Sequence, residues 1–369
     1  MLLFSGALLA ALFAVTAALA RSYHAREEGL ATEWFQRGNA DLAAGKPQRA
    51  FEDFRTSLSY SPDSSDVQLR LAEALLADGR LDETRSYLLN LWERAPGSGQ
   101  VNLDLAHVSM ETGNVDDAIR YFHGAILGSW ERAPMTERRN VRLELCEFLL
   151  DRKLTSDARA EIAGLVVDTP GDNGELREQN GRLFLRVGEP ARALTEFEAA
   201  LRVNPRQSRW LAEAGQVAFD DGDYFKAESY LSKADRESPS EKNHALLEVV
   251  RGVVGNDPFL DGLSREEQAR RSWRDFRQGL ERLQECIQTE PKSLSGSGSG
   301  ADLPALQKEA RDLRKRVNVA SMERSADVRA DAMNFVARVE DAASLQCGPG
   351  SSSDRALKII ERRHEVNSQ

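Results

Sequence analysis

Residues 31–64 read ATEWFQRGNADLAAGKPQRAFEDFRTSLSYSPDS, and their landmarks recur along much of the 369-residue chain. Glycine returns every 34 residues, at Gly45, Gly79 and Gly113. Four further pairs of like residues keep this spacing: Pro62 and Pro96, Gly188 and Gly222, Ala193 and Ala227, and Pro205 and Pro239. A period of this length is the signature of a solenoid, because one such unit cannot bury its apolar face alone and stacks on its neighbours.

Each period predicts two amphipathic helices. A glycine near the middle suits the turn after the first helix, and a proline stops the second. Small residues such as Gly38 and Gly181 let paired helices approach closely, and large ones such as Phe54 and Phe197 fill the space between units. This register gives six units: 31–64, 65–98, 99–132, 139–172, 174–207 and 208–240. A six-residue insertion around 130–134 precedes the fourth.

The order W-x3-G, Gly, A-x3-F-x2-A and Pro resembles the tetratricopeptide repeat (TPR) family over residues 31–239. The pattern departs from the family at Thr84, which replaces an alanine, and at Cys146, which occupies a small-residue position. The resemblance implies an all-α fold, a right-handed TPR solenoid of about six helix-turn-helix repeats. Residues 21–239 are expected to form this solenoid.

In TPR proteins the first helix of each repeat lines a concave groove. Chaperone-binding members grip a C-terminal carboxylate there with a Lys/Asn/Arg cluster, but only Asn39 fits that scheme, and Phe35 stands where the lysine would be. The resemblance instead implies a mixed apolar and polar groove for an extended peptide or a helix. By register its residues are Phe35, Asn39, Leu42, Leu69, Glu73, Leu76, Leu103, His107, Met110, Leu143, Glu147, Leu150, Glu178, Arg182, Leu185, Arg186, Gln216 and Phe219.

Residues 1–20, MLLFSGALLAALFAVTAALA, form a long uncharged apolar run. Twenty helical residues cover about 30 Å, so the run predicts a single-pass anchor in a lipid bilayer. The rival is a signal peptide cleaved after Ala18-Leu19-Ala20, and the lack of a basic residue before the run favours the anchor. Arg21 and Arg26 argue for a cytoplasmic flank, whereas anchors of this kind often export the body, so the side, periplasmic or cytoplasmic, stays open. An anchored helical repeat protein resembles a bacterial type.

The C-terminal third departs from the repeat. We expect helices that cap the solenoid end at residues 241–292. A Gly/Ser linker is predicted at 293–301, which read SLSGSGSGA, and a further helical segment is predicted at 302–369. A returning C-terminal helix would bring Cys347 towards Cys286. Either these two form a disulfide in an oxidising compartment, with Cys146 as a core thiol, or all three cysteines stay unpaired.

The chain carries 49 basic and 59 acidic residues, a net charge of −10. An acidic chain speaks against nucleic acid as its main ligand, because phosphate binding needs an excess of Lys and Arg. The sequence holds no zinc-spaced Cys/His cluster and no HExxH, GxSxG or phosphate-loop motif. We therefore expect no catalytic residue, no metal and no cofactor.

These observations favour a non-catalytic, membrane-tethered scaffold that recruits a protein partner for assembly of an envelope or secretory complex. The first alternative is a self-associating homo-oligomeric platform at the membrane. A remote alternative is an enzyme whose site is assembled from residues far apart in the sequence, which a motif search does not detect.

Overall fold

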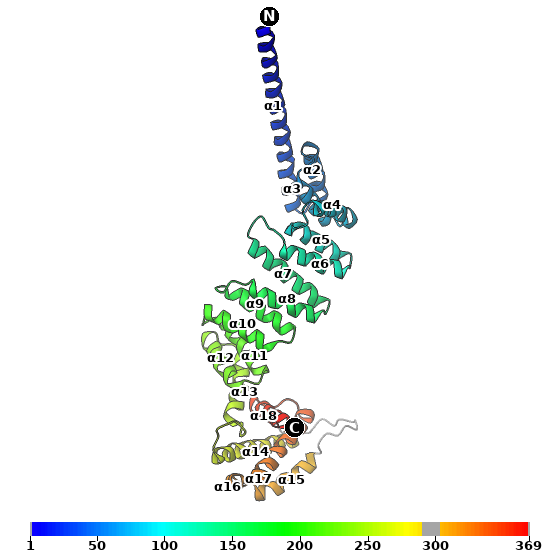
Figure 1. The fold of residues 1–369 in the computed structure, drawn as a ribbon. Helices are drawn as coiled ribbons and strands as arrows, with labels where there is room; N and C mark the ends of the chain where they lie inside the picture. The colour runs from blue at the N-terminus through cyan, green and yellow to red at the C-terminus, as the bar shows by residue number, and fades with distance from the viewer. Residues whose placement is uncertain (1, 290–302, 368–369) are drawn as a thin grey trace. The chain divides into compact units, whose positions relative to one another are not determined.

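The computed structural model describes residues 2–289 and 303–367, and the side chains of 12–289 and 303–362. Within these residues the regular elements are the helices α1–α18 (Figure 1). The all-α repeat array predicted from the sequence is therefore confirmed. The chain divides into two compact units, Met1–Thr169 and Pro170–Gln369, and each is described by itself.

The first unit contains four helix pairs. A pair consists of a first helix, a tight turn and an antiparallel second helix that packs against it. The helices are α1 (Leu2–Ala43), α2 (Pro47–Tyr60), α3 (Ser65–Ala77), α4 (Leu81–Arg94), α5 (Gly99–Glu111), α6 (Val115–Leu127), α7 (Pro134–Asp151) and α8 (Thr155–Val167).

Small residues at the points where the two helices of a pair cross allow the helices to pack closely. A Cβ atom added at Gly38 would lie 2.6 Å from Cε1 of Phe54, whose side chain is fully buried between α1 and α2. In the second unit a Cβ atom at Gly181 would lie 2.9 Å from Phe197 in the same way. A glycine at this position is thus required by the bulk of the aromatic ring opposite, as the repeat pattern predicts.

The turns inside the pairs explain the 34-residue glycine period. Gly45, Gly79 and Gly113 have φ values of 69°, 75° and 75°, in the left-handed region that glycine adopts without a steric penalty. The fourth pair makes the same turn with Lys153 at φ 60°. The missing glycine in that repeat is therefore a change of residue and not a change of turn.

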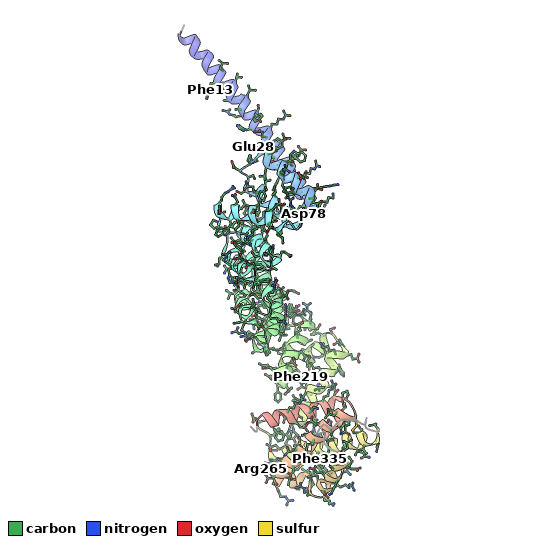
Figure 2. The ribbon with its side chains drawn as sticks, turned by 90° about the vertical axis from the view of Figure 1, so that its right-hand side faces the viewer. Phe13, Glu28, Asp78, Phe219, Arg265 and Phe335 are labelled. Atoms are coloured by element: carbon green, nitrogen blue, oxygen red, sulfur yellow. A yellow bond between two sulfur atoms is a disulfide. The ribbon has the colours of Figure 1, made fainter. Side chains whose placement is uncertain are left out.

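Helix α1 corrects the prediction for the N-terminus. It is one continuous helix from Leu2 to Ala43, and its last turns pack against α2, where the Ser57 hydroxyl donates to the Ala31 carbonyl at 2.7 Å. Phe13 is 75% exposed, and Figure 2 shows it on a bare stretch of this helix.

Among the described residues, none of the helices combines the length and the apolar character that a bilayer crossing requires. The predicted single-pass membrane anchor, and with it the predicted contact of residues 1–20 with a lipid bilayer, is therefore wrong.

The second unit begins with two more helix pairs and continues into a bundle of unequal helices. The pairs are α9 (Gly174–Arg186) with α10 (Pro190–Val203) and α11 (Ser208–Asp220) with α12 (Tyr224–Glu237). The bundle contains α13 (Glu241–Asn256), α14 (Arg265–Gln288), α15 (Leu303–Arg316), α16 (Val319–Arg324), α17 (Ala326–Gln346) and α18 (Ser352–Asn367). The Gly/Ser linker predicted at 293–301 lies outside the described residues.

One apolar core joins the bundle to the last helix pair. Phe335 of α17 (Figure 2) and Phe276 of α14 are fully buried with ring centroids 5.6 Å apart. The same cluster includes Leu231 of α12. Cys286 of α14 and Cys347 at the end of α17 form a disulfide with their Cα atoms 5.6 Å apart. Cys146 is a buried free thiol in the first unit. The bundle thus covers the apolar end of α12.

Candidate functional site

The predicted groove residues of the first unit share one kind of environment. All twelve, from Phe35 to Leu150, lie on the first helices α1, α3, α5 and α7, and all are partly exposed beside fully buried neighbours. Leu42 and Phe35 also pack against the apolar cluster around Phe54. The positions predicted from the repeat register therefore form a partly exposed face of the first helices, directly above the buried core.

Four of these residues come together at one cleft. Phe35 and Asn39 of α1 and Leu69 and Glu73 of α3 line a hollow of about 970 Å³. The other lining residues are Ser65, Asp66, Arg70, Leu91, Arg94, Ala95, Ser98, Gln100, Val101, Ser129, Trp130, Glu131, Arg132 and Glu137. The predicted positions Leu76, Leu103, His107, Met110, Leu143, Glu147 and Leu150 do not line it.

The insertion between α6 and α7 builds one wall of this cleft. The backbone N–H of Ser129 donates to the Gly97 carbonyl at 2.8 Å, and the N–H of Gly99 donates to the Ser129 carbonyl at 2.9 Å. Nε1 of Trp130 donates to the Ala125 carbonyl at 3.0 Å, and its ring lies on Gly99. These contacts fix the insertion against the start of α5.

Replacing Gly99 with alanine is expected to disturb this wall. The new Cβ atom would lie 2.3 Å from Cε2 of Trp130, so the indole ring has to move. We expect Gly99→Ala to lower the free energy of unfolding by about 1–3 kcal/mol, the usual effect of overpacking. Urea denaturation checks this, with Gly97→Ala as control because a Cβ atom there meets nothing within 4 Å. Equal stability of the two variants would contradict the docking of Trp130 on Gly99.

The cleft combines an apolar floor with charges of both signs. Phe35, Leu69 and Trp130 supply large apolar surfaces. Four carboxylates face three arginines around them, and Arg70 and Glu73 form an ion pair at 2.7 Å. Apolar anchors with a few polar groups that fix orientation are the usual composition of a binding site.

A buried acid lies directly behind the cleft. Asp104 of α5 is 4% exposed, and its Oδ1 accepts a hydrogen bond at 3.0 Å from Gln100, a lining residue. Burial, together with the nearby charge of Glu73, raises the pKa of Asp104 to about 7. On the next turn, burial opposes the charging of His107 more than any other single cause. Its 2.6 Å hydrogen bond to Glu144 and the nearby charges of Glu144, Asp104 and Glu111 together outweigh burial and raise the His107 pKa.

In the second unit the predicted positions on α9 form an ionic network. Glu178 is 4% exposed, and its Oε2 accepts from Nε1 of Trp210 at 2.7 Å and from Arg209. Arg182 pairs with Glu178 at 2.7 Å and also with Glu213 of α11. The carboxylate of Glu178 therefore links α9 to α11 and is covered by its own partners.

The other predicted positions of this unit differ in exposure. Leu185 and Arg186 are exposed on α9. On α11, Gln216 is half-buried and donates to Asp220 at 3.0 Å, and Phe219 packs on the C-terminal core with its ring 5.7 Å from that of Tyr224. Phe219 thus belongs to the contact between the last helix pair and the bundle.

Sequence reasoning missed fourteen of the lining residues, among them those of the insertion. Trp130, Glu131 and Arg132 line the cleft although they lie outside the helix register. A signal was present, since the insertion itself interrupts a regular array and carries a tryptophan. Loops on a rigid scaffold often carry binding residues.

Comparison with known proteins supports the assignment of the repeats. Tetratricopeptide repeat models match residues 41–91, 75–127 and 179–242. DnaJ homolog subfamily C member 3 of Bos taurus is 21% identical over 249 residues, 62% of this chain and 49% of that protein. Tetratricopeptide repeat protein 21A of Mus musculus is 26% identical over 199 residues, 52% of this chain and 14% of that protein. The chain thus spans about half the length of the first relative and much less of the second.

Solved structures are similar at a lower level. The crystal structure of YrrB is described as that of a TPR protein with an unusual peptide-binding site, and its sequence is 17% identical to this chain. The match covers 52% of this chain and 97% of the YrrB chain, with a TM-score of 0.38. PilW, described as a type IV pilus biogenesis factor, is 15% identical with coverage of 59% and 98% and a TM-score of 0.38. TPR arrays are interaction scaffolds that are generally non-catalytic. The chain therefore contains tetratricopeptide repeats, which the family models match over residues 41–127 and 179–242.

Proposed function

We propose that this chain is a non-catalytic scaffold that holds a peptide or a single helix of a partner protein in the cleft of its first unit, as a step in assembling a larger complex. The observation that carries the proposal is the convergence of Phe35, Asn39, Leu69 and Glu73 with the docked insertion at one hollow. Residues from two first helices and one loop thereby face the same space.

The chemistry of the cleft suits a short segment of polypeptide. Leu69 and Trp130 supply apolar contact for one or two side chains of the segment, and Arg94, Arg132 and Glu131 supply charges of both signs at the rim. Asn39 adds an amide, which can both donate to and accept from a peptide backbone. We therefore expect a ligand with an apolar anchor and flanking charged residues.

Leu69→Asp is the substitution that tests this proposal. Leu69 is partly exposed in the cleft, whereas Phe35 also packs on the core around Phe54, so Leu69 is changed with less effect on folding. A carboxylate at the apolar floor should weaken partner binding by about tenfold or more, which corresponds to about 1.4 kcal/mol. Quantitative mass spectrometry of proteins retained by the immobilised full chain, with and without the substitution, measures this.

The matched control is Leu127→Asp. Leu127 of α6 is 80% exposed and does not line the cleft, so the same change of chemistry is made elsewhere in the same unit. The proposal expects one set of retained proteins to be lost with Leu69→Asp and kept with Leu127→Asp. Loss of the same proteins from both variants, or from neither, would refute the cleft as the binding site.

A further inference from the structure

The C-terminal bundle contains a second cleft, which does not belong to the repeat register. It has a volume of about 840 Å³ and lies between α14 and the loop that leads into α18. Arginines of α14 dominate its lining, and Trp273 and Val319 add apolar surface. This second cleft shares no lining residue with the cleft in the first unit.

The wall opposite α14 has a fixed conformation. The disulfide between Cys286 and Cys347 ties the start of this loop to α14. Gly348 follows with φ 90°, a left-handed conformation that favours glycine. A Cβ atom at Gly350 would lie 2.4 Å from Oδ2 of Asp354, so glycine is also needed for close approach. The wall therefore exists before a ligand binds.

Arg282 forms the base of the cleft. Its side chain is 11% exposed, and its Nη2 donates to the Gly348 carbonyl at 2.7 Å. Its Nε has no hydrogen-bond partner in the described structure and lies 3.9 Å from Oδ2 of Asp354. That carboxylate oxygen already accepts from the Ser351 N–H at 2.7 Å. The guanidinium is thus fixed at the bottom of the hollow, where it adds positive charge.

Three exposed arginines extend from this base along α14. Arg270 pairs with Glu266, Arg274 donates to the neutral amide oxygen of Asn256 at 2.8 Å, and Arg277 lies 3.6 Å from Glu281. Exposed pairs within one helix contribute little energy, so a ligand can displace them at small cost. Arg274 and Arg277 therefore remain available to an anionic ligand.

The charge balance of the lining is opposite to that of the chain. Four arginines face three carboxylates, Glu281, Glu285 and Asp354, a local balance of +1, while the chain as a whole carries −10. Asp354 is occupied within the loop, where it accepts from Ser351 and from Gln278. Two exposed carboxylates thus oppose three exposed arginines.

We infer that this cleft binds an extended acidic peptide whose Asp or Glu residues alternate with apolar ones. Arginines three or four positions apart on a helix lie about 5–6 Å from one another, close to the ~6.6 Å between alternate side chains of an extended strand. Each guanidinium can hold a carboxylate through two parallel hydrogen bonds. From Arg270 to Arg282 the helix rises about 18 Å, the length of five or six extended residues. Trp273 receives an apolar side chain of the peptide.

Fluorescence anisotropy with a labelled peptide tests this inference. The probe is Glu-Leu-Glu-Leu-Glu-Leu-Glu, and the comparison peptide carries Gln in place of each Glu. The full chain is expected to bind the acidic peptide about tenfold more tightly than the Gln peptide, and added salt should reduce the difference. The double substitution Arg274→Glu with Arg277→Glu should remove that preference.

The matched control is Arg311→Glu with Arg314→Glu. These residues have the same spacing on α15, are exposed, and lie outside the cleft. The control should retain binding within about twofold, because these two arginines do not line the cleft. Equal binding of both peptides, or equal loss of binding in both double variants, would overturn the inference. It would also be overturned if the chain preferred anionic lipid vesicles to the peptide and the Arg274 and Arg277 substitutions abolished that vesicle binding. If the reversed charges unfold the bundle, Arg274→Gln with Arg277→Gln gives the same test.

Discussion

Removal of the Cys286–Cys347 disulfide is expected to lower the free energy of unfolding of the C-terminal bundle by about 4 kcal/mol. The bond closes a loop with a sequence separation of 61 residues, and a loop of that length gains much conformational freedom in the unfolded chain once the bond is absent. In the folded chain the bond joins the last turn of α14 to the end of α17, two helices that share the core around Phe276 and Phe335.

Cys347→Ala makes this change, because Cys347 is only partly buried and its loss leaves little cavity. Amide hydrogen exchange along α17 reports the stability of the bundle separately from that of the first unit. A reducing agent should lower protection in the wild-type chain as much as the substitution does, and should have no further effect on the variant. Protection in α17 that neither treatment changes would show that the disulfide contributes nothing to the stability of the bundle.

Asp275→Asn is expected to stabilise the same bundle by several kcal/mol at pH 8, and hardly at all at pH 4. Asp275 of α14 is fully buried, and neither carboxylate oxygen has a hydrogen-bond partner in the described structure. Burial raises its pKa from 3.8 to about 8. Since the folded chain binds the proton more tightly than the unfolded chain, stability falls as the pH rises from about 4 to about 8 and is constant above that.

The difference in free energy of unfolding between Asp275→Asn and the wild-type chain, measured by denaturation at several pH values, isolates this group. It should increase through the interval from pH 4 to pH 8 and reach about 6 kcal/mol at most, since the pKa rises from 3.8 to about 8 and each pKa unit corresponds to about 1.4 kcal/mol. Asp312→Asn, at an exposed carboxyl of α15, is the control for replacing an acid in this unit. A difference that does not depend on pH would contradict a buried, proton-binding Asp275.

Much of the repeat array could be predicted because the residues that determine each helix pair lie close together in the sequence. The close approach of Gly38 to Phe54 and of Gly181 to Phe197 follows from the size of the residues at fixed offsets in each repeat. The positive φ of Gly79 follows from the same period. Each of these contacts lies within one helix pair, so a 34-residue window contains both partners.

The cleft depended on contacts for which the repeat pattern assigns no position. Trp130 rests on Gly99, but Trp130 belongs to the insertion between α6 and α7, which has no place in the 34-residue register. Glu178 is buried because Trp210, one repeat later, covers and hydrogen-bonds its carboxylate. The repeat register does not contain this contact, so it predicted Glu178 as a groove residue. The predicted anchor was wrong, since none of the helices in the described part of the chain has the length and apolar character that a bilayer crossing requires.

Site-specific photo-crosslinking at Leu69 tests the central claim most directly. A photoreactive benzophenone side chain there faces the cleft, and the same side chain at Leu127 of α6 faces solvent outside it. We expect peptides from one partner protein, with an apolar residue flanked by charges, to become attached at position 69 and not at position 127. Attachment of the same peptides at both positions, or only at position 127, would contradict the cleft as the place where this scaffold holds its partner.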